Sequence, residues 1–404
     1  MSFGFIYRLT SSRLGRPLTQ AVLTLCILCG QSNAQEWKTL KSGVEYAEVT
    51  KEISGLKVNM NLLRLDLKKV RIDVHHAMDA AIGTEKTSSI ATRHGAFAAI
   101  NAGFFRLDTS IWAGDSVGTL QIDRKLLSES TNDRIALMIK NSSLETSVGI
   151  GHLKQNYYLE VLEVKRGRLV TKSNLEISGI NRERKDNEII LFTPEFGSTT
   201  LTNPGGIEVI FRNTGKQSHS VEIRESGSNV IPRDGYILSA SGSRKNELLG
   251  LNRKNTALAL SVPVSVVNLR GRPQEAALTG LSQVEDITNG VPQLIKNSKI
   301  DITWEQEKSS KSFVETRHPR TAVAKLRDGK FLMITVDGRS EVSGGIGLQD
   351  LAEYLLSLGA ADAMNLDGGG STTMFVDGKV VNKPSDKEGE RKVSDALVVT
   401  LRKK

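Results

Sequence analysis

Short apolar segments, each followed by glycine, asparagine or aspartate, constrain the fold of this chain more than any other feature. Segments of this length that are rich in Val, Ile, Leu and Phe are typical of β-strands that end in turns. The clearest ones cover residues 58–67, 70–75, 97–100, 135–139, 207–211, 236–239, 257–267, 331–336 and 397–401. Helical patterns occur at residues 88–94 and 348–358. The sequence therefore predicts the α+β fold class, with a strand-rich mixed sheet, hairpins and few helices.

The C-terminal part of the chain predicts two hairpins and a crossover. Asp328-Gly329 lies between two apolar runs, which favours a two-residue turn, and that register places Arg320 directly opposite Asp337. A helix and another strand follow, which indicates a β-α-β crossover with parallel strands. Because such strands end at the same edge of a sheet, we expect Asp337, Asp367 and Arg320 to converge there. Asp377-Gly378 predicts a further hairpin.

The N-terminus has the layout of a secretory signal peptide. Three arginines precede an apolar run at residues 21–30, and small residues at 32–34 offer a cleavage site. We expect residues 1–34 to be removed, which makes the mature protein periplasmic or secreted; a retained N-terminal anchor is the alternative. No later segment is apolar enough to cross a bilayer, so no stable membrane insertion is expected after cleavage.

Removal of this segment changes the bulk properties of the chain. It contains both cysteines, three of the 54 basic residues and none of the 45 acidic ones, so the net charge falls from +9 to +6. A mild positive excess suits polyanionic surroundings, but no basic run is interleaved with aromatics, so no nucleic-acid partner is predicted. No flexible linker interrupts residues 35–404, which predicts a single domain. Residues 149–230 indicate only strands and charged loops.

A glycine-rich block carries the clearest signal for chemistry. Asn365 and Asp367 end an apolar strand, and Gly368, Gly369 and Gly370 follow, which lets backbone approach a ligand closely. Amide groups of such a loop bind anions, and the next two residues, Ser371 and Thr372, add hydroxyl groups. The loop lacks the lysine of a nucleotide-binding P-loop. A purely structural turn is the alternative interpretation.

Two other motifs have both a functional and a structural interpretation. Asn101 follows an apolar strand and could bind a sugar hydroxyl, or it could belong to a turn beside two core phenylalanines. Arg320 could clamp a phosphate, because a guanidinium matches phosphate oxygens with two parallel bonds, or it could form an ion pair with Asp337. Arg339 could bind phosphate in the same way. The six histidines show no metal-ligand spacing, so no metal site is predicted from them.

These motifs occur in the order found in a known family. Asn101 to Phe105, Arg317 to Ala324, Asp337 to Arg339, the helix at 348–359 and Asn365 to Thr373 together resemble the phosphodiester glycosidase family. Weaker similarity surrounds them, so the resemblance implies one domain of this type over residues 35–404, with a motif core at 95–402. Bacterial members are often related to exopolysaccharides. One departure is Asn289, where the family pattern leads us to expect glycine.

The resemblance implies hydrolysis of the sugar C1–O bond in a sugar 1-phosphodiester, with an N-acetylhexosamine-like sugar. The products are the free sugar and a phosphomonoester. Asp367 is the expected nucleophile or oxocarbenium stabiliser, and Asp337 its partner base or orienter. The expected substrate-binding residues are Asn101, Arg320, Arg339, Asn365, Gly368, Gly369, Gly370, Ser371 and Thr372.

Two alternative functions remain open from the sequence. One is a metal-assisted phosphodiesterase in which Asp337, Asp367 and Asn365 hold calcium or magnesium, since these cations prefer oxygen ligands. The other is a non-catalytic module that binds envelope glycan or exopolysaccharide. Paired carboxylates favour catalysis over simple binding. Apart from that divalent cation, no cofactor is expected.

Overall fold

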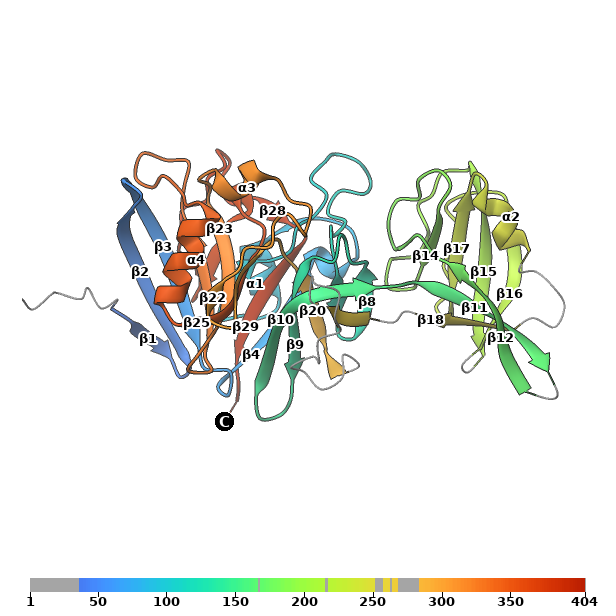
Figure 1. Cartoon of the computed structure of the whole chain (residues 1–404), viewed down its shortest axis with the longest axis horizontal. Helices are drawn as coiled ribbons and strands as arrows, with labels where there is room; N and C mark the ends of the chain where they lie inside the picture. The colour runs from blue at the N-terminus through green and yellow to red at the C-terminus, as the bar shows by residue number, and fades with distance from the viewer. Residues whose placement is uncertain are drawn as a thin grey trace, which may run out of the picture. The chain divides into compact units, whose positions relative to one another are not determined.

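The computed structural model describes residues 36–165, 168–214, 217–250, 257–261, 264–267 and 283–403, of which residues 36–403 belong to one unit. The signal peptide predicted at 1–34 lies outside the described residues. Strands dominate this part of the chain, and its α-helices are short: α1 (Thr87–Arg93), α2 (Arg244–Leu249), α3 (Lys311–Glu315) and α4 (Leu348–Ser357) (Figure 1). The predicted strand-rich fold with few helices is confirmed. No helix among the described residues is long and apolar enough to cross a membrane.

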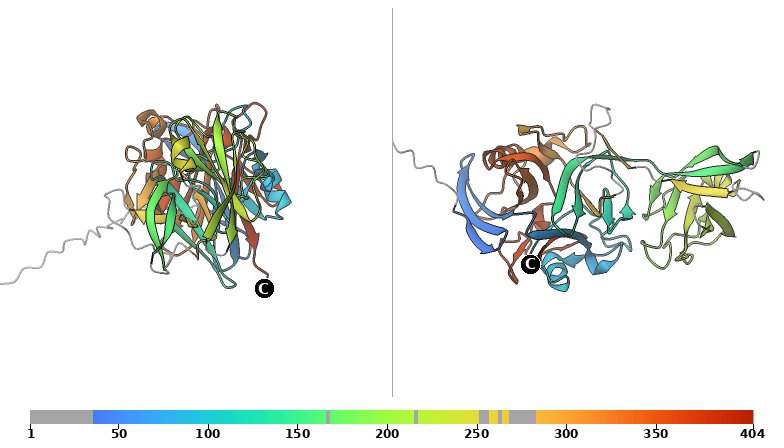
Figure 2. Two further views of the ribbon diagram at one scale, coloured as in Figure 1. Left: turned by 90° about the vertical axis from the view of Figure 1, so that its right-hand side faces the viewer. Right: turned by 90° about the horizontal axis from the view of Figure 1, so that it is seen from below.

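Two antiparallel sheets that share a core form the part of the fold that carries the site. In spatial order, sheet 1 contains β1 (Lys38–Lys41), β2 (Val44–Ile53), β3 (Leu56–Leu65), β24 (Phe331–Val336), β23 (Arg320–Leu326), β25 (Ala360–Asn365), β21 (Gln293–Lys296) and β22 (Lys299–Ile300). Sheet 2 contains β27 (Lys379–Val380), β26 (Met374–Val376), β6 (Ala98–Asn101), β29 (Asp395–Leu401) and β4 (Val70–His76). The blue hairpin β2–β3 therefore lies beside the orange strands β23 and β24 (Figures 1 and 2).

The central strands of sheet 1 are buried on both faces, which explains why they are almost continuously apolar. Successive side chains of a strand point to opposite faces. Leu63 and Met333 accordingly pack in a core shared with sheet 2, whereas their neighbours Leu62 and Leu332 pack in the core that contains α4. On the other side of sheet 2, α1 contributes to a further apolar cluster. The layers thus run in the order α4, sheet 1, sheet 2, α1.

Two more sheets complete the described structure. Sheet 3 contains β19 (Val264–Val267), β10 (Thr146–Gln155), β9 (Ile135–Asn141), β20 (Asp286–Asn289), β7 (Leu120–Ile122) and β8 (Lys125–Ser128). Sheet 4 contains β12 (Arg168–Glu176), β11 (Tyr158–Lys165), β18 (Ala257–Ser261), β16 (Gln217–Arg224), β15 (Gly206–Thr214), β17 (Gly235–Ser241), β14 (Ile189–Phe192) and β13 (Gly179–Ile180). About half of the stretch 149–230, to which the sequence assigned little, therefore lies in strands of sheet 4. Strands β5 (Glu85–Lys86) and β28 (Lys392–Val393) form a separate pair.

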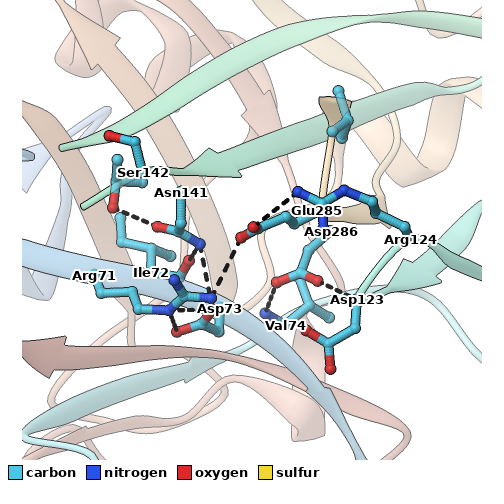
Figure 3. A network of polar contacts seen from close by, with 12 residues as sticks. Arg71, Ile72, Asp73, Val74, Asp123, Arg124, Asn141, Ser142, Glu285 and Asp286 are labelled. Atoms are coloured by element: carbon cyan, nitrogen blue, oxygen red, sulfur yellow. Dashed lines mark hydrogen bonds and ion pairs between the residues drawn. The ribbon is translucent and has the colours of Figure 1, made fainter. Parts of the chain in front are cut away.

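Buried polar groups join sheet 3 to sheet 2 (Figure 3). Asp286 on β20 accepts hydrogen bonds from the amides of Val74 and Asp123, both of 2.9 Å. Glu285 accepts from Arg71 on β4 at 3.3 Å. Burial raises the pKa of Asp286 to about 7. This carboxyl group therefore connects strand β4 of sheet 2 to strand β20 of sheet 3 while shielded from solvent.

The predicted register of the hairpin β23–β24 is wrong by one residue. Arg320 pairs with Val336, not with Asp337, because the turn has three residues between Leu326 and Lys330. Gly329 adopts a φ of +84°, as expected for a three-residue turn that ends in a left-handed residue. A slip of one residue sends a side chain to the other face of a sheet.

The predicted hairpin at Asp377-Gly378 is confirmed, since Val376 pairs with Lys379 across a two-residue turn. In the predicted crossover, β24 and β25 both run antiparallel to β23, which lies between them. The two strands connected through α4 therefore point in the same direction without being neighbours. Asp337 and Asp367 accordingly follow strands that end on the same side of sheet 1.

The double-sided burial of sheet 1 leads to a prediction about stability. Replacing the fully buried Leu332 by alanine should lower the free energy of unfolding by about 2–5 kcal/mol, because the variant loses apolar burial and leaves a cavity. The matched control Leu144→Ala, at a side chain that is 80% exposed, should change it by less than about 0.5 kcal/mol. Urea unfolding of both variants measures this difference, and equal losses would contradict the burial described here.

Candidate functional site

The glycine-rich block leaves sheet 1 at the end of β25 and enters sheet 2 at β26. It passes through a single 3₁₀ turn, η3 (Gly369–Ser371). Asp367 donates its amide to the carbonyl of Ala102, and Gly369 donates to the carbonyl of Pro319, both at 2.9 Å. The block is therefore fixed by backbone hydrogen bonds from β6 on one side and from the segment before β23 on the other.

The side chain of Asn101, at the end of β6, also holds the glycine-rich block in place. Its amide group donates to the carbonyl of Asp367 at 2.7 Å, and its side-chain oxygen accepts from the Thr321 hydroxyl at 2.7 Å and the Thr373 amide at 3.1 Å. The side chain is completely buried. In this structure Asn101 holds the loop, and its predicted contact with substrate stays untested.

The three glycines of the block lie close to three arginines. A Cβ atom at Gly368 would lie 3.8 Å from Cδ of Arg320, and one at Gly369 would lie 3.0 Å from Nη2 of Arg339. At Gly370 a Cβ atom would overlap the guanidinium of Arg391, at 2.1 Å. A side chain at position 370 would therefore displace this guanidinium and the Asp386 carboxylate, whose Oδ1 would lie 2.2 Å from the same Cβ atom. The arrangement surrounds the loop with positive charge.

The carboxyl group of Asp367 lies within this positive surrounding. It accepts the amide of Gly368 at 2.9 Å, and the side chain is partly exposed. Burial raises the pKa of Asp367 to about 6, although the Ser371 hydroxyl, the Gly368 amide and the positive charge of Arg391 oppose the shift. A carboxyl with such a pKa can change its protonation state close to neutral pH, as catalytic carboxylates do.

Asp337 is connected to the glycine-rich block through the side chain of Asn382. Its Oδ1 accepts hydrogen bonds from the Asn382 amide group at 3.3 Å and from the backbone amide of Lys383 at 3.0 Å. Asn382 also donates to the carbonyl of Thr372 at 3.0 Å. Burial raises the pKa of Asp337, which is only 6% exposed. The structure therefore places both predicted carboxylates next to the same loop, with Asn382 connecting Asp337 to it.

Arg320 does not face Asp337, which corrects the predicted ion pair. Its guanidinium donates to the carbonyls of Phe313, Thr316 and Ile346 at 2.6, 2.9 and 3.3 Å. The one-residue shift in register sends this side chain toward α3 and α4. Burial, helped by the charge of Arg339, lowers the pKa of Arg320 to about 10. Within the described residues this arginine is paired with carbonyl oxygens and forms no ion pair.

Arg339 is the more accessible of the two predicted arginines. It is exposed, it adopts a φ of +57°, and it forms no ion pair within the described ranges. His318 lies close enough to Arg320 and Arg339 for both charges, together with burial, to lower the pKa of its imidazole. A neutral imidazole and an unpaired guanidinium therefore lie beside the glycine-rich loop.

Several polar atoms of the block are buried without a hydrogen-bond partner among the described residues. They include Oδ1 of Asn365 and the hydroxyl oxygens of Thr372 and Thr373. Buried polar groups are nearly always paired, so atoms of this kind indicate water or ligand. The amide group of Asn365 is already occupied by the carbonyls of Val291 and Leu366, at 2.7 and 2.8 Å. Ser371 and Thr372 are buried in the loop rather than displayed on its surface.

Sequence reasoning did not identify four residues that the structure brings to the site. Asn382 connects Asp337 to the loop, and Asp386 forms a two-point ion pair with Arg391 at 2.7 and 3.0 Å. Asp395 is fully buried next to Asp367 and raises its pKa. Thr321, the fourth residue, bonds to Asn101. Asp395 and Thr321 lie on apolar strands, where a polar residue at a buried position was the available signal.

Asn289, the departure from the expected glycine, has a defined role. It is 1% exposed, accepts the amide of Phe104 at 3.1 Å and donates to the Ser116 hydroxyl at 3.1 Å. The divalent cation suggested for Asp337, Asp367 and Asn365 stays a prediction, since no ligand geometry tests it.

Comparison with known proteins confirms the predicted family resemblance over part of the chain. Residues 205–400 match the phosphodiester glycosidase family, a range that contains Asp337, Arg339 and the glycine-rich block but not Asn101. The chain is similar to N-acetylglucosamine-1-phosphodiester alpha-N-acetylglucosaminidase of Mus musculus, with 32% identity over 168 residues, which cover 39% of this chain and 30% of that protein. The match thus spans less than a third of the relative's length.

Two crystal structures share the fold. A Synechocystis protein superimposes with a TM-score of 0.71 at 21% identity and covers 91% of this chain and 64% of that one. A Burkholderia pseudomallei protein gives a TM-score of 0.68 at 22% identity, covering 85% of this chain and 74% of its own. At this identity the likeness establishes a common fold.

The raised pKa of Asp367 predicts how stability depends on pH. The folded protein holds this proton up to about pH 6, whereas the unfolded chain releases it near a pKa of about 3.9. The folded state therefore binds more protons between these values, and its stability falls as pH rises from about 4 to about 6. Asp367→Asn should make the fall shallower in urea unfolding series across that window.

The matched control for this experiment is Asp377→Asn, at an exposed turn that tolerates asparagine in the left-handed conformation. It should keep the wild-type slope between about pH 4 and about pH 6, the window set by the two pKa values. If Asp367→Asn also keeps that slope, the carboxyl of Asp367 is not shielded as the structure indicates.

Proposed function

We propose that this chain hydrolyses the C1–O bond of a sugar 1-phosphodiester and releases a free sugar and a phosphomonoester. The observation that carries the proposal is the position of Asp367, a carboxyl group with a raised pKa in a loop whose glycines face arginines. The match of residues 205–400 to the phosphodiester glycosidase family supports it, and the activity for which the mouse relative is named suggests an N-acetylhexosamine-like sugar.

The phosphate side of the substrate accounts for the positive charge around the loop. Arg339 has no carboxylate partner within the described residues, so its guanidinium is available to hold two phosphate oxygens. Arg391 is already paired with Asp386, and Arg320 with carbonyls. We therefore assign phosphate contact to Arg339 and give Arg320 a supporting role through its buried charge. The loop residues 368–372, with Asn365, would hold the sugar or the remaining phosphate oxygens.

The carboxyl groups of Asp367 and Asp337 would act on the sugar side of the substrate. When the C1–O bond breaks, its electron pair leaves with the phosphate oxygen, and positive charge develops at C1. Ionised Asp367 would stabilise that charge or attack C1, and water would then supply the hydroxyl of the free sugar. Asp337 would accept a proton from that water or orient it. Because the phosphomonoester is a good leaving group, a strong general acid is not needed.

We also propose that the enzyme works outside the cytoplasm, in the periplasm or after secretion. The signal-peptide layout of residues 1–34 supports export, and the mild positive charge of the remaining chain suits phosphate-containing envelope polymers. The substrate would then be an exported sugar phosphodiester or an envelope glycan that carries one.

Replacement of Asp367 tests the proposed reaction. Asp367→Asn should reduce sugar release from N-acetylhexosamine 1-phosphodiesters by about a thousandfold or more, because the variant loses the charge opposite C1. In the wild-type enzyme, kcat/KM should fall as pH drops below about 6, where Asp367 becomes protonated. The assay quantifies sugar and phosphomonoester separately for α- and β-linked substrates, with and without chelator.

The products separate this proposal from its alternatives. Release of a sugar phosphate instead of a free sugar, with loss of turnover in chelator, would indicate a metal-assisted phosphodiesterase. Binding without either product would indicate a glycan-binding module. Asp377→Asn should retain wild-type turnover, and circular dichroism should show that Asp367→Asn keeps the strand signal.

Replacement of Arg339 tests the assignment of the phosphate contact. Arg339→Ala should raise KM for the phosphodiester by about tenfold or more, since a charge-assisted, two-point contact is removed. The control Arg224→Ala, at an exposed arginine of β16 in sheet 4, should leave KM unchanged. An unchanged KM in Arg339→Ala would assign the phosphate to another group of the loop.

A further inference from the structure

Two histidines and an aspartate, residue types that can bind metal ions, meet outside the site described above. His75 lies on β4, Asp79 ends the 3₁₀ turn η1 (Ala77–Asp79), and His94 follows the last residue of α1. One ligand atom from each lies within 4.8 Å of the other two. Nε2 of His94 is 3.0 Å from Oδ1 of Asp79, and the two imidazole rings stack with centroids 3.5 Å apart.

The backbone at η1 is shaped in a way that places Asp79 there. Met78 and Asp79 both adopt positive φ, at 56° and 52°, a conformation that is uncommon for residues other than glycine but that aspartate tolerates better than methionine. The amide of Met78 is held by the Glu85 carboxylate at 2.7 Å, and the Met78 side chain is 60% exposed. Burial of Met78 therefore does not explain the turn. Its effect is to point Asp79 at His94.

A cavity adjoins the three side chains. It has a volume of about 410 Å³ and is lined by His75, Asp79 and His94 together with Asp123 and Glu195. A metal ion bound by these three side chains would therefore have room for a coordinated water or a further small molecule. Among the described residues, no other group of three His, Cys, Asp or Glu side chains converges as closely.

A cationic group already occupies the position beside Asp79. Nη1 of Arg93 donates to Oδ2 of Asp79 and lies 3.0 Å from Nε2 of His94. Nη2 of the same guanidinium lies 2.8 Å from Glu85 and 3.3 Å from the carbonyl of His76. Arg93 can thus leave Asp79 and keep two other partners. The carboxylates of Asp79 and Glu85 thus already bind a positively charged group.

We propose that His75, Asp79 and His94 bind a divalent transition-metal ion of the zinc type, which takes the place of the Arg93 guanidinium. Two imidazole nitrogens and one carboxylate oxygen are a donor set that suits Zn²⁺, and three protein ligands leave a fourth position for water. Stacked rings direct their lone pairs in parallel, so binding requires the rings to rotate about χ2 until the lone pairs converge. The fourth position then opens into the cavity.

Titration of the mature chain with Zn²⁺ and Co²⁺ tests this proposal. After treatment with chelator, calorimetry should give one ion bound per chain, and Co²⁺ should develop the visible absorption of a four-coordinate site. His94→Ala and Asp79→Asn should each weaken binding by about tenfold or more. Arg93→Met, which removes the competing cation, should strengthen it by about tenfold, the size typical of changes around metal ligands.

Control variants keep the test specific. His219→Ala, on β16 of sheet 4, should bind the ion as the wild type does. Asp337→Asn and Asp367→Asn should also bind normally, because neither belongs to this cluster. Absence of binding in the wild type, unchanged affinity in the double variant of His75→Ala and His94→Ala, or loss of binding in Asp367→Asn would each overturn the proposal. Circular dichroism confirms that the variants remain folded, so a loss of affinity reports on the ligands.

Discussion

The hydrogen bonds of one buried amide, Asn101, hold the site together. The side chain lies at the end of β6 in sheet 2, yet it bonds to Asp367 and Thr373 on the two sides of the glycine-rich turn and to Thr321 in sheet 1. No water can replace these contacts, because the side chain is completely buried. An unpaired polar group here would cost the full desolvation of the amide. The position of the catalytic candidate thus depends on the packing of sheet 1 against sheet 2, since Asn101 spans both.

Periodicity predicted strands in all four sheets, among them β3, β4, β6, β9, β24 and β29, but not their exact pairing. The apolar runs that end before Asp337 and Asp367 were evident because both faces of those strands are buried. The register failed because a turn of two or three residues at Asp328-Gly329 has nearly the same local sequence, and a single residue decides which face Arg320 occupies. In sheet 4 periodicity predicted β15, β17 and β18 but not β11, β12 or β16, whose sequences contain many charged and polar residues. Local sequence determines strand existence well, whereas register depends on contacts distant in the chain.

The loop combines two electrostatic effects that oppose each other at Asp367. Burial raises the pKa of its carboxyl group, while the charge of Arg391 lowers it, and burial is the larger. Hydrogen bonds from the Ser371 hydroxyl and the Gly368 amide also lower the pKa, whereas the negative charge of Asp395 adds to burial in raising it. Asp395 is distant in the sequence, so the protonation of Asp367 depends on a group that only the fold brings to it.

The same dependence on distant contacts explains why the histidine cluster was not predicted. His75 and His94 are separated by a strand end, a 3₁₀ turn and a helix, so their spacing matches no local metal motif. They meet because β4 and α1 both pack on β29 of sheet 2, where Asp395 pairs with His76, the neighbour of His75. The cluster and the glycine-rich loop thus share one strand as support. A change that moved β29 would disturb both places at once, whereas a ligand variant at Asp79, on an exposed turn, affects the cluster alone.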